Sequence, residues 1–180
     1  MKKLLTFLTA AAIGAATQAA TVGWSIGKTD ASYKGDAYQI FVIGQNGVTS
    51  ADAVKLLLDA GTDVSDKAFG TGVLTTANGG VTVNAGSSGK TLGEGTYTAF
   101  FVVYDSATPT AGTSKYVILD NVGSETVAAT TATFSFKGKD QSAVVADSSN
   151  WSSFGPVPEP TTAALLALGL AAFGLKRKVA

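Results

Sequence analysis

The run from Thr96 to Asp105, TYTAFFVVYD, constrains the fold more than any other segment of the chain. Apolar residues follow one another in its middle, so a strand here presents apolar side chains to both faces of a sheet. Such a strand needs a covering layer on each side, which places it near the centre of a sheet. The run from Ala37 to Gly44, AYQIFVIG, has the same character and predicts a second central strand.

Shorter β segments accompany these two strands. The segment Thr131–Lys137 alternates apolar and polar side chains, with Ala132, Phe134 and Phe136 inward, as expected of a strand with one solvated face. Further strands are predicted at 21–26, with Val22, Trp24 and Ile26 on one face, at 73–76 and 81–84 around a hairpin turn at 78–80, and at 115–120, paired with 96–105 across the loop 109–112.

One helix is predicted near residues 50–60. Thr49 and Asp52 have the spacing of a capping box, and Gly61 is placed to end the helix. Before it, Asn46-Gly47 predicts a tight turn. The side chains expected to share the buried face are Ala53, Leu56, Leu57 and Ala60.

These segments together predict a mainly β protein. About seven short strands with closely spaced turns favour a single β-sandwich or jelly-roll-like domain into which the helix is inserted. The alternative is an α+β sheet with the helix packed on it. The β-rich body is expected to span residues 21–146, followed by a Ser-rich linker at 147–156, DSSNWSSFGP.

The N-terminus has the three parts of an export signal, predicted at residues 1–20. Lys2 and Lys3 give a positive start, and residues 4–16 form an apolar core without a polar face. Small residues follow, so cleavage is expected after Ala19 or Ala20. The segment therefore predicts a signal helix, removed by signal peptidase during export.

The C-terminus combines a Pro-rich tetrapeptide, an apolar stretch at 161–175 and a basic cluster. At about 1.5 Å per residue the apolar stretch reaches about 22 Å as a helix, short of the about 30 Å of a hydrocarbon core. Bilayer thinning and snorkelling basic side chains close such a gap, and the basic cluster is expected to stay cytoplasmic. The tetrapeptide is Val157, Pro158, Glu159 and Pro160, and the cluster that stops the membrane helix is Lys176, Arg177 and Lys178.

This order of features in residues 157–180 resembles the PEP-CTERM sorting signal of Gram-negative bacteria, also known as the ice-binding protein C-terminal motif. The resemblance implies processing by an exosortase, a membrane transpeptidase that recognises the Pro-Glu-Pro region and removes the helix. It implies a precursor anchored transiently in the inner membrane and a mature protein at the cell surface or in extracellular polymer. It implies nothing about the fold or activity of the body.

The charge of the body argues against nucleic acid as a partner. The chain holds thirteen basic and thirteen acidic residues, but five of the basic ones lie in the two end segments. Residues 21–155 keep eight Lys against twelve Asp and Glu and contain no Arg, whereas nucleic-acid binders carry basic patches.

The composition also limits chemistry. The chain has neither Cys nor His, which removes thiol nucleophiles, His bases and the usual ligands of zinc and haem iron. No catalytic residue, metal site or cofactor is therefore predicted. The segment 84–91, NAGSSGKT, ends like a phosphate-binding loop, but Asn84 stands where that pattern needs Gly, and no helix can begin at the Gly-rich residues that follow.

Two weaker patterns suggest binding sites. Four carboxylates lie close together in the sequence and would bind calcium if their segment folded around one cation: Asp52, Asp59, Asp63 and Asp66. They lack the spacing of an EF-hand loop. Trp24, Trp151 and the tyrosines are the candidates for stacking on sugars, although Trp24 is expected in the core. Helix caps and solvated charges are the simpler roles for the carboxylates.

Two functions are consistent with these observations. The first is a structural or adhesive component of the cell surface or extracellular matrix, without catalysis. The alternative is a carbohydrate-binding module displayed at the surface, with extracellular polysaccharide as its partner. A smooth surface of Thr, Ser and Lys favours the first, and a row of exposed aromatics or a groove that combines aromatic and Asp or Asn side chains favours the second.

Overall fold

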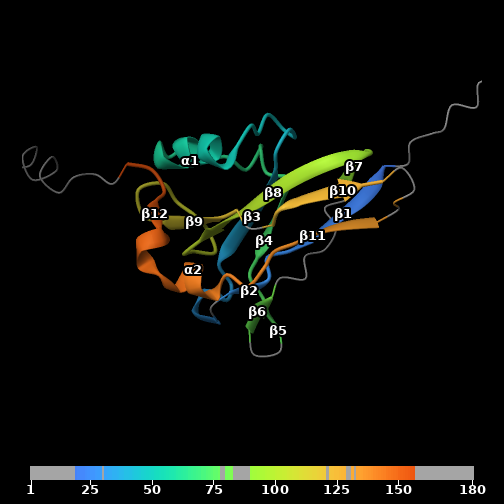
Figure 1. The fold of residues 1–180 in the computed structure, drawn as a ribbon. Coiled ribbons are helices and arrows are strands. Elements are labelled where there is room, and N and C mark those ends of the chain that lie inside the picture. The colour runs from blue at the N-terminus through green and yellow to red at the C-terminus, as the bar shows by residue number, and fades with distance from the viewer. Residues whose placement is uncertain are drawn as a thin grey trace, which may run out of the picture.

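The computed structural model describes residues 19–29, 31–77, 80–82, 90–120, 122–128, 131 and 133–156. Their main element is a six-stranded sheet (Figure 1). Five strands follow the order β12-β9-β8-β3-β4, and the sixth, β10, pairs with β8 outside this order. The strands are β3 (Ala37–Val42), β4 (Gly70–Val73), β8 (Gly95–Tyr104), β9 (Lys115–Leu119), β10 (Ser124–Val127) and β12 (Ser152–Ser153).

The two runs predicted to be central form the middle of this sheet. β8 pairs antiparallel with β3 on one side and with β9 on the other, so that Phe101 stands between Ile40 and Leu119. All side chains from Ala99 to Tyr104 are buried. The predicted pairing of β9 with β8 across the 109–112 loop is confirmed. A strand flanked on both edges and covered on both faces has to be apolar at every position, which is the pattern in the sequence.

A small second sheet covers one face of the large one. It has the order β11-β1-β7, formed by β1 (Ala20–Ser25), β7 (Thr91–Leu92) and β11 (Thr133–Lys137), and β1 runs parallel to β11. Val22, Trp24 and Phe136 are buried against the large sheet as predicted, and Phe134 is half-buried. Ala132 lies outside the described residues. The parallel pairing of the first strand with one of the last was not predicted, because periodicity reports which face is buried but not which strands pair.

The predicted hairpin near 78–80 is present with shifted strands. β5 (Thr76–Ala77) pairs antiparallel with β6 (Gly80–Thr82), which also pairs with β2 (Lys28–Thr29). Residues 78–79 and 83–84 lie outside the described ranges. The preceding strand, β4, starts at Gly70 instead of Val73. Its two glycines weaken the strand pattern in the sequence. A short 3-10 helix, η1 (Ala31–Tyr33), lies elsewhere in the chain, before β3.

The helix is present, but its predicted cap is wrong by one residue. In α1 (Ala51–Asp59) the capping side chain is Ser50, whose Oγ accepts a hydrogen bond from the backbone N–H of Ala53 at 3.1 Å. Thr49 carries the same kind of hydroxyl, but Ser50 is the residue next to the first turn, and its extended backbone is the conformation from which this bond forms. Gly61 ends the helix with a positive φ of 75°, as predicted.

The predicted buried face of α1 is also wrong. Val54 and Leu58 are buried against the sheet, whereas Leu56 is 71% exposed. Nearly every position of this helix from Ala53 to Ala60 is apolar, so two neighbouring stripes fit a helical period equally well. The packing of α1 on the sheet buries the stripe that contains residues 54 and 58. The sequence alone does not show which of the two stripes is buried.

Residues 147–156 are part of the folded body, which corrects the predicted Ser-rich linker. They follow α2 (Ser142–Ala146), form a 3-10 turn, η2 (Ser148–Asn150), and then β12, which pairs antiparallel with β9. Phe154 is buried in the core beneath α1. A Ser-rich composition predicts a solvated linker, but here the serines follow the edge of a sheet and a single Phe fixes the segment.

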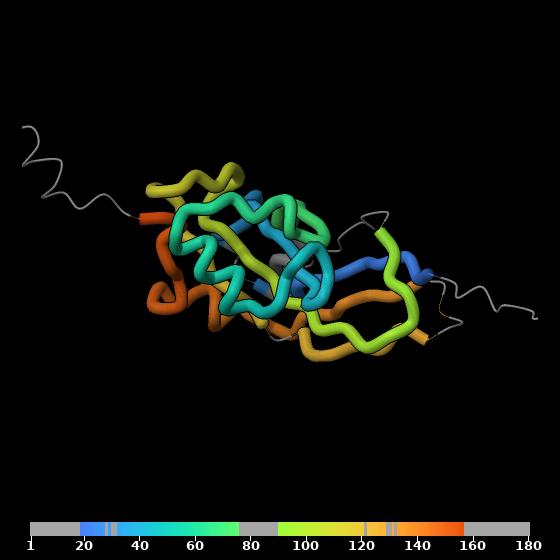
Figure 2. The backbone as a smooth tube through the Cα atoms, turned by 90° about the horizontal axis from the view of Figure 1, so that it is seen from above, coloured from blue at the N-terminus to red at the C-terminus, as the bar shows by residue number. Residues whose placement is uncertain are grey.

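The prediction of a mainly β body with one inserted helix is confirmed. α1 lies on the face of the large sheet opposite to the small sheet, and Figure 2 shows it from above, across β3 and β8. The described chain begins at one end of the body and ends at the other (Figures 1 and 2). Among the described residues no helix is long and apolar enough to cross a membrane. The predicted signal helix and membrane helix, 4–16 and 161–175, lie outside those residues.

Candidate functional site

The residues of the sorting tail lie outside the described part of the chain: Val157, Pro158, Glu159, Pro160, Lys176, Arg177 and Lys178. The structure shows how the body holds the residues just before them. The backbone N–H of Phe154 donates to Ser114 O at 2.9 Å, and that of Gly155 donates to Leu58 O at 2.8 Å. Gly112 N–H donates in turn to Phe154 O at 2.6 Å. Backbone hydrogen bonds therefore hold the described chain as far as Gly155, two residues before the predicted motif.

At the opposite end, the first strand begins next to the predicted cleavage point. Ala20 is fully buried and pairs with Leu92 in β7. Of the two bonds predicted for signal peptidase, the one after Ala19 leaves β1 complete, and the one after Ala20 removes its first residue.

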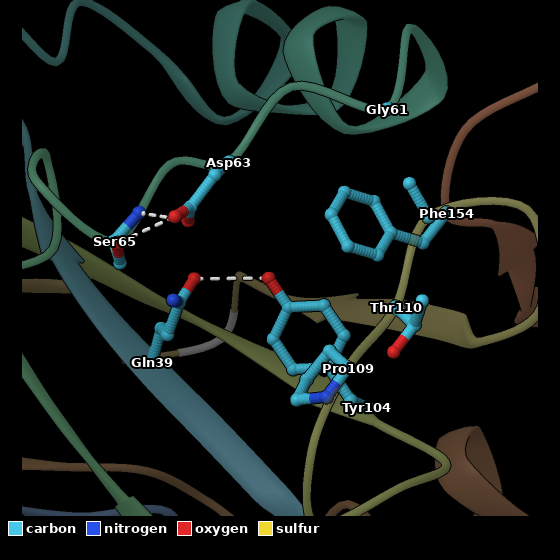
Figure 3. A pocket seen from close by; sticks show the side chains of 9 residues that line it. Gln39, Gly61, Asp63, Ser65, Tyr104, Pro109, Thr110 and Phe154 are labelled. Atoms are coloured by element: carbon cyan, nitrogen blue, oxygen red, sulfur yellow. Dashed lines mark hydrogen bonds between the residues drawn. The ribbon is translucent and has the colours of Figure 1, made fainter.

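A pocket of about 420 Å³ lies between the segment that follows α1 and the large sheet, close to where the described chain ends (Figure 3). Four separate segments supply its lining: β3, β8 and the segments that follow α1 and β8, with Phe154 closing one side. The lining residues whose side chains could contact a ligand are Gln39, Asp63, Tyr104, Pro109, Thr110 and Phe154.

Two polar side chains form the floor of this pocket. The Tyr104 hydroxyl donates a hydrogen bond to Gln39 Oε1 at 2.9 Å, which orients the amide of Gln39. Burial, with the Asp63 carboxylate nearby, raises the pKa of Tyr104 far above its usual value, so the hydroxyl keeps its proton. The Phe154 ring meets the Tyr104 ring edge to face, with centroids 5.8 Å apart.

The carboxylate of Asp63 stands at the edge of the pocket. It accepts hydrogen bonds from the backbone N–H and the hydroxyl of Ser65 at 2.9 and 3.0 Å, which fix its position. Asp59 faces away to other partners, Lys55 at 2.7 Å and the Tyr116 hydroxyl at 2.6 Å. Hydrogen bonds from these two partners outweigh the effect of burial and hold the pKa of Asp59 below its usual value.

The four carboxylates weighed as calcium ligands are not brought together. Within the described ranges, no three Asp, Glu, His or Cys side chains form a group that could hold a metal ion. Lys90, from the segment that resembled a phosphate-binding loop, donates to Ala68 O at 3.0 Å and lies 5.4 Å from the centre of the Phe69 ring. Residues 83–89 lie outside the described part.

The candidate sugar-stacking aromatics are mostly internal. Trp24 is 4% exposed and donates from Nε1 to the Tyr38 hydroxyl at 3.0 Å. Trp151 docks on the body, stacks on Tyr33 with centroids 5.0 Å apart and donates from Nε1 to Val145 O at 2.8 Å. Both members of this stack are half-buried, so it presents no row of exposed rings.

Outer strand surfaces are covered with hydroxyl groups instead. In the small sheet, Thr21 pairs with Thr133 on one side and Thr91 on the other. We call the solvent-facing surface of this sheet the hydroxyl face; it consists of Thr21, Gly23, Ser25, Thr91, Thr133, Ser135 and Lys137. A second hollow, of about 510 Å³, lies between β10 and β11 and is lined by Glu125, Thr126, Thr133, Phe134, Ser135 and Lys137.

Sequence reasoning missed the pocket residues Gln39 and Phe154, and it included Tyr104 only among the tyrosines as candidates for stacking on sugars. Gln39 lies within a run that predicts a central strand, and Phe154 lies in the segment predicted to be a linker. One signal was present: Gln39 is the only polar side chain inside the apolar run AYQIFVIG, where a polar group needs a buried partner.

Comparison with known proteins identifies the tail and not the body. The family model of the PEP-CTERM protein-sorting motif matches residues 156–178, which confirms the resemblance found in the sequence. No curated protein and no solved structure matches the chain. The motif implies an exported protein that is anchored in a membrane while an exosortase processes it, before placement at the cell surface.

Proposed function

We propose that the body is a non-catalytic structural or adhesive module of the cell surface or extracellular matrix. The observation that supports this role is the hydroxyl face, where Thr, Ser and Lys side chains point to solvent and the aromatic rings of the same strands point inward. A surface of this composition suits repeated, weak contacts with hydrated polymer. The absence of Cys and His from the whole sequence supports a role without catalysis.

Cell fractionation tests the route to the surface. Deleting Pro158–Pro160 should leave the body folded and hold the protein in the inner membrane, because the exosortase loses its recognition element while the apolar helix is kept. An antibody to the body follows the protein between fractions. Release of the deletion variant to the surface at the level of the unaltered protein would contradict exosortase sorting.

Retention in the extracellular matrix tests the adhesive role. The protein should sediment with isolated matrix, and Thr133→Glu with Ser135→Glu should reduce that retention by placing two charges on the hydroxyl face. Thr108→Glu, in an exposed turn away from that face, is the control. Equal retention of both variants, or none of the unaltered protein, would contradict an adhesive hydroxyl face.

A surface-displayed carbohydrate-binding module is the second candidate. The observation that favours it is the pocket, which combines the aromatic side chains of Tyr104 and Phe154 with the amide of Gln39 and the carboxylate of Asp63. Sugar-binding proteins use such combinations because aromatic rings pack on C–H groups while amides and carboxylates bind hydroxyls.

A further inference from the structure

We propose that the pocket beneath α1 binds one neutral hexose residue at the end of an extracellular polysaccharide chain. The inference rests on the proposed display of the body at the cell surface, where such polymers occur. It adds a ligand class and a position to that function.

The shape of the pocket suits a chain end. Its volume of about 420 Å³ lies within the about 300–1,000 Å³ usual for small-molecule sites. The segment after α1 lies on one side, the 109–111 loop and Phe154 lie on another, and β3 and β8 form the floor (Figure 3). A pocket lined from several directions accepts a terminal residue more readily than the middle of a long chain.

The apolar part of the lining suits the C–H face of a sugar ring. Pro109 contributes a saturated ring and Ala111 a methyl group, whereas Phe154 and Tyr104, 7% and 2% exposed, contribute only a small part of their rings. The edge-to-face contact between the two aromatic rings fixes their orientation.

The polar part of the lining offers both a donor and an acceptor. Since Gln39 Oε1 accepts the bond from Tyr104, its Nε2 carries two N–H groups that make no hydrogen bond to any residue the structure describes. Asp63, held in place by Ser65, supplies carboxylate oxygens. A sugar hydroxyl is donor and acceptor at once, so neighbouring hydroxyls can satisfy both groups.

The charge of the lining selects against anionic sugars. Asp63 is its charged side chain, and no Lys or Arg is among the residues that line the pocket, all of which the structure describes. A uronate, sulfate or phosphate would meet a like charge without a compensating cation. The lining therefore favours a neutral sugar over an anionic one.

Saturation-transfer difference NMR on the full chain tests this assignment. The protein is held in micelles of a phosphocholine detergent, which has no sugar headgroup. The probes are the methyl hexopyranosides of the gluco, manno and galacto series, with glucuronate as the anionic probe. Transfer to at least one neutral methyl hexoside and none to glucuronate is expected. Transfer to none of the neutral probes, or to glucuronate as well, would overturn the assignment.

Two variants locate the binding. Asp63→Asn keeps an acceptor for Ser65 but removes the charge, so affinity should fall about tenfold, the share of one charge-assisted hydrogen bond. Gln39→Glu keeps the acceptor for Tyr104 but removes the donor, and binding should be lost. Glu94→Gln, which removes an exposed carboxylate outside both the pocket and the hydroxyl face, should bind as the unaltered protein does. Unchanged affinity in both pocket variants would refute the site. Surface localisation is measured separately, so absence of binding in a correctly sorted protein rejects the pocket alone.

Discussion

The two faces of the large sheet are covered in different ways. The face beneath the small sheet is apolar, and a buried hydrogen bond in its described core joins Trp24 Nε1 to the Tyr38 hydroxyl. The face beneath α1 also buries aromatic rings, such as the stacked pair Phe41 and Phe100, but it keeps hydroxyl groups bonded to side chains of the rim. Tyr104 bonds to Gln39 in this way, and Tyr116 to Asp59.

This difference follows from the shape of the covering element. Two packed sheets interdigitate their side chains and leave little space between them, whereas one short helix covers only part of a sheet. The remainder beneath α1 is closed by loops and by Phe154, and the pocket lies there. The face beneath the small sheet, the sheet-covered face, therefore contributes stability. The face beneath α1, the helix-covered face, carries the groups suited to binding.

The largest effect is expected on the sheet-covered face. Phe101 is fully buried and meets Tyr38 edge to face at 6.3 Å. Phe101→Ala should lower the free energy of unfolding by about 3–5 kcal/mol, because the small sheet and large sheet cannot close over the cavity. Urea unfolding of the body, residues 20–156, measures it. A loss below about 1 kcal/mol would show that this face is loosely packed and would remove the contrast between the two faces.

The next effect compares two leucines of α1. Leu58→Ala should lower the free energy of unfolding by about 2–5 kcal/mol, because Leu58 is fully buried against the sheet. Leu56→Ala is the matched control. It should change the free energy by less than about 0.5 kcal/mol, since that side chain is 71% exposed. Equal losses of unfolding free energy in the two variants would show that Leu56 is packed as well as Leu58, as the sequence predicted.

The same contrast explains what the sequence could predict. Strands Ala37–Val42 and Gly95–Tyr104 are apolar on both faces, so their central position follows from their composition alone. The parallel pairing of β1 with β11 joins segments more than a hundred residues apart, and no local pattern encodes it. The buried stripe of α1 and the pocket were missed for a related reason: both depend on which element happens to cover which part of the sheet.

A third prediction concerns a glycine that the sheet-covered face requires. A Cβ at Gly72 would lie 2.6 Å from the Tyr38 hydroxyl and 2.7 Å from its ring, and Trp24 holds that ring in place. Gly72→Ala should therefore cost about 1–3 kcal/mol of unfolding free energy. Gly93→Ala is the control, because a Cβ there meets nothing within 4 Å. Thermal unfolding of both variants checks the prediction, and equal midpoints would mean that Tyr38 can move at little cost.

The smallest effect distinguishes the helix-covered face by its response to pH. Burial alone would raise the pKa of Asp59, but hydrogen bonds from Lys55 and Tyr116 outweigh it and hold the pKa below the usual value. A lowered pKa in the folded state means that Asp59 stabilises the fold above the unfolded pKa, near 4, and that this contribution is lost as the pH falls through the folded pKa.

The carboxylate is largely exposed, so solvent screening limits the contribution to about 0.5 kcal/mol. Urea unfolding at pH 6 should show Asp59→Asn destabilised by about that amount relative to the unaltered body, and at pH 2.5 the difference should vanish. Tyr116→Phe removes one of the two donors and should show a smaller dependence on pH than the unaltered body. If the unaltered body and Asp59→Asn lose stability in parallel between pH 6 and pH 2.5, the polar partners beneath α1 contribute only positioning, and the contrast with the sheet-covered face is one of shape alone.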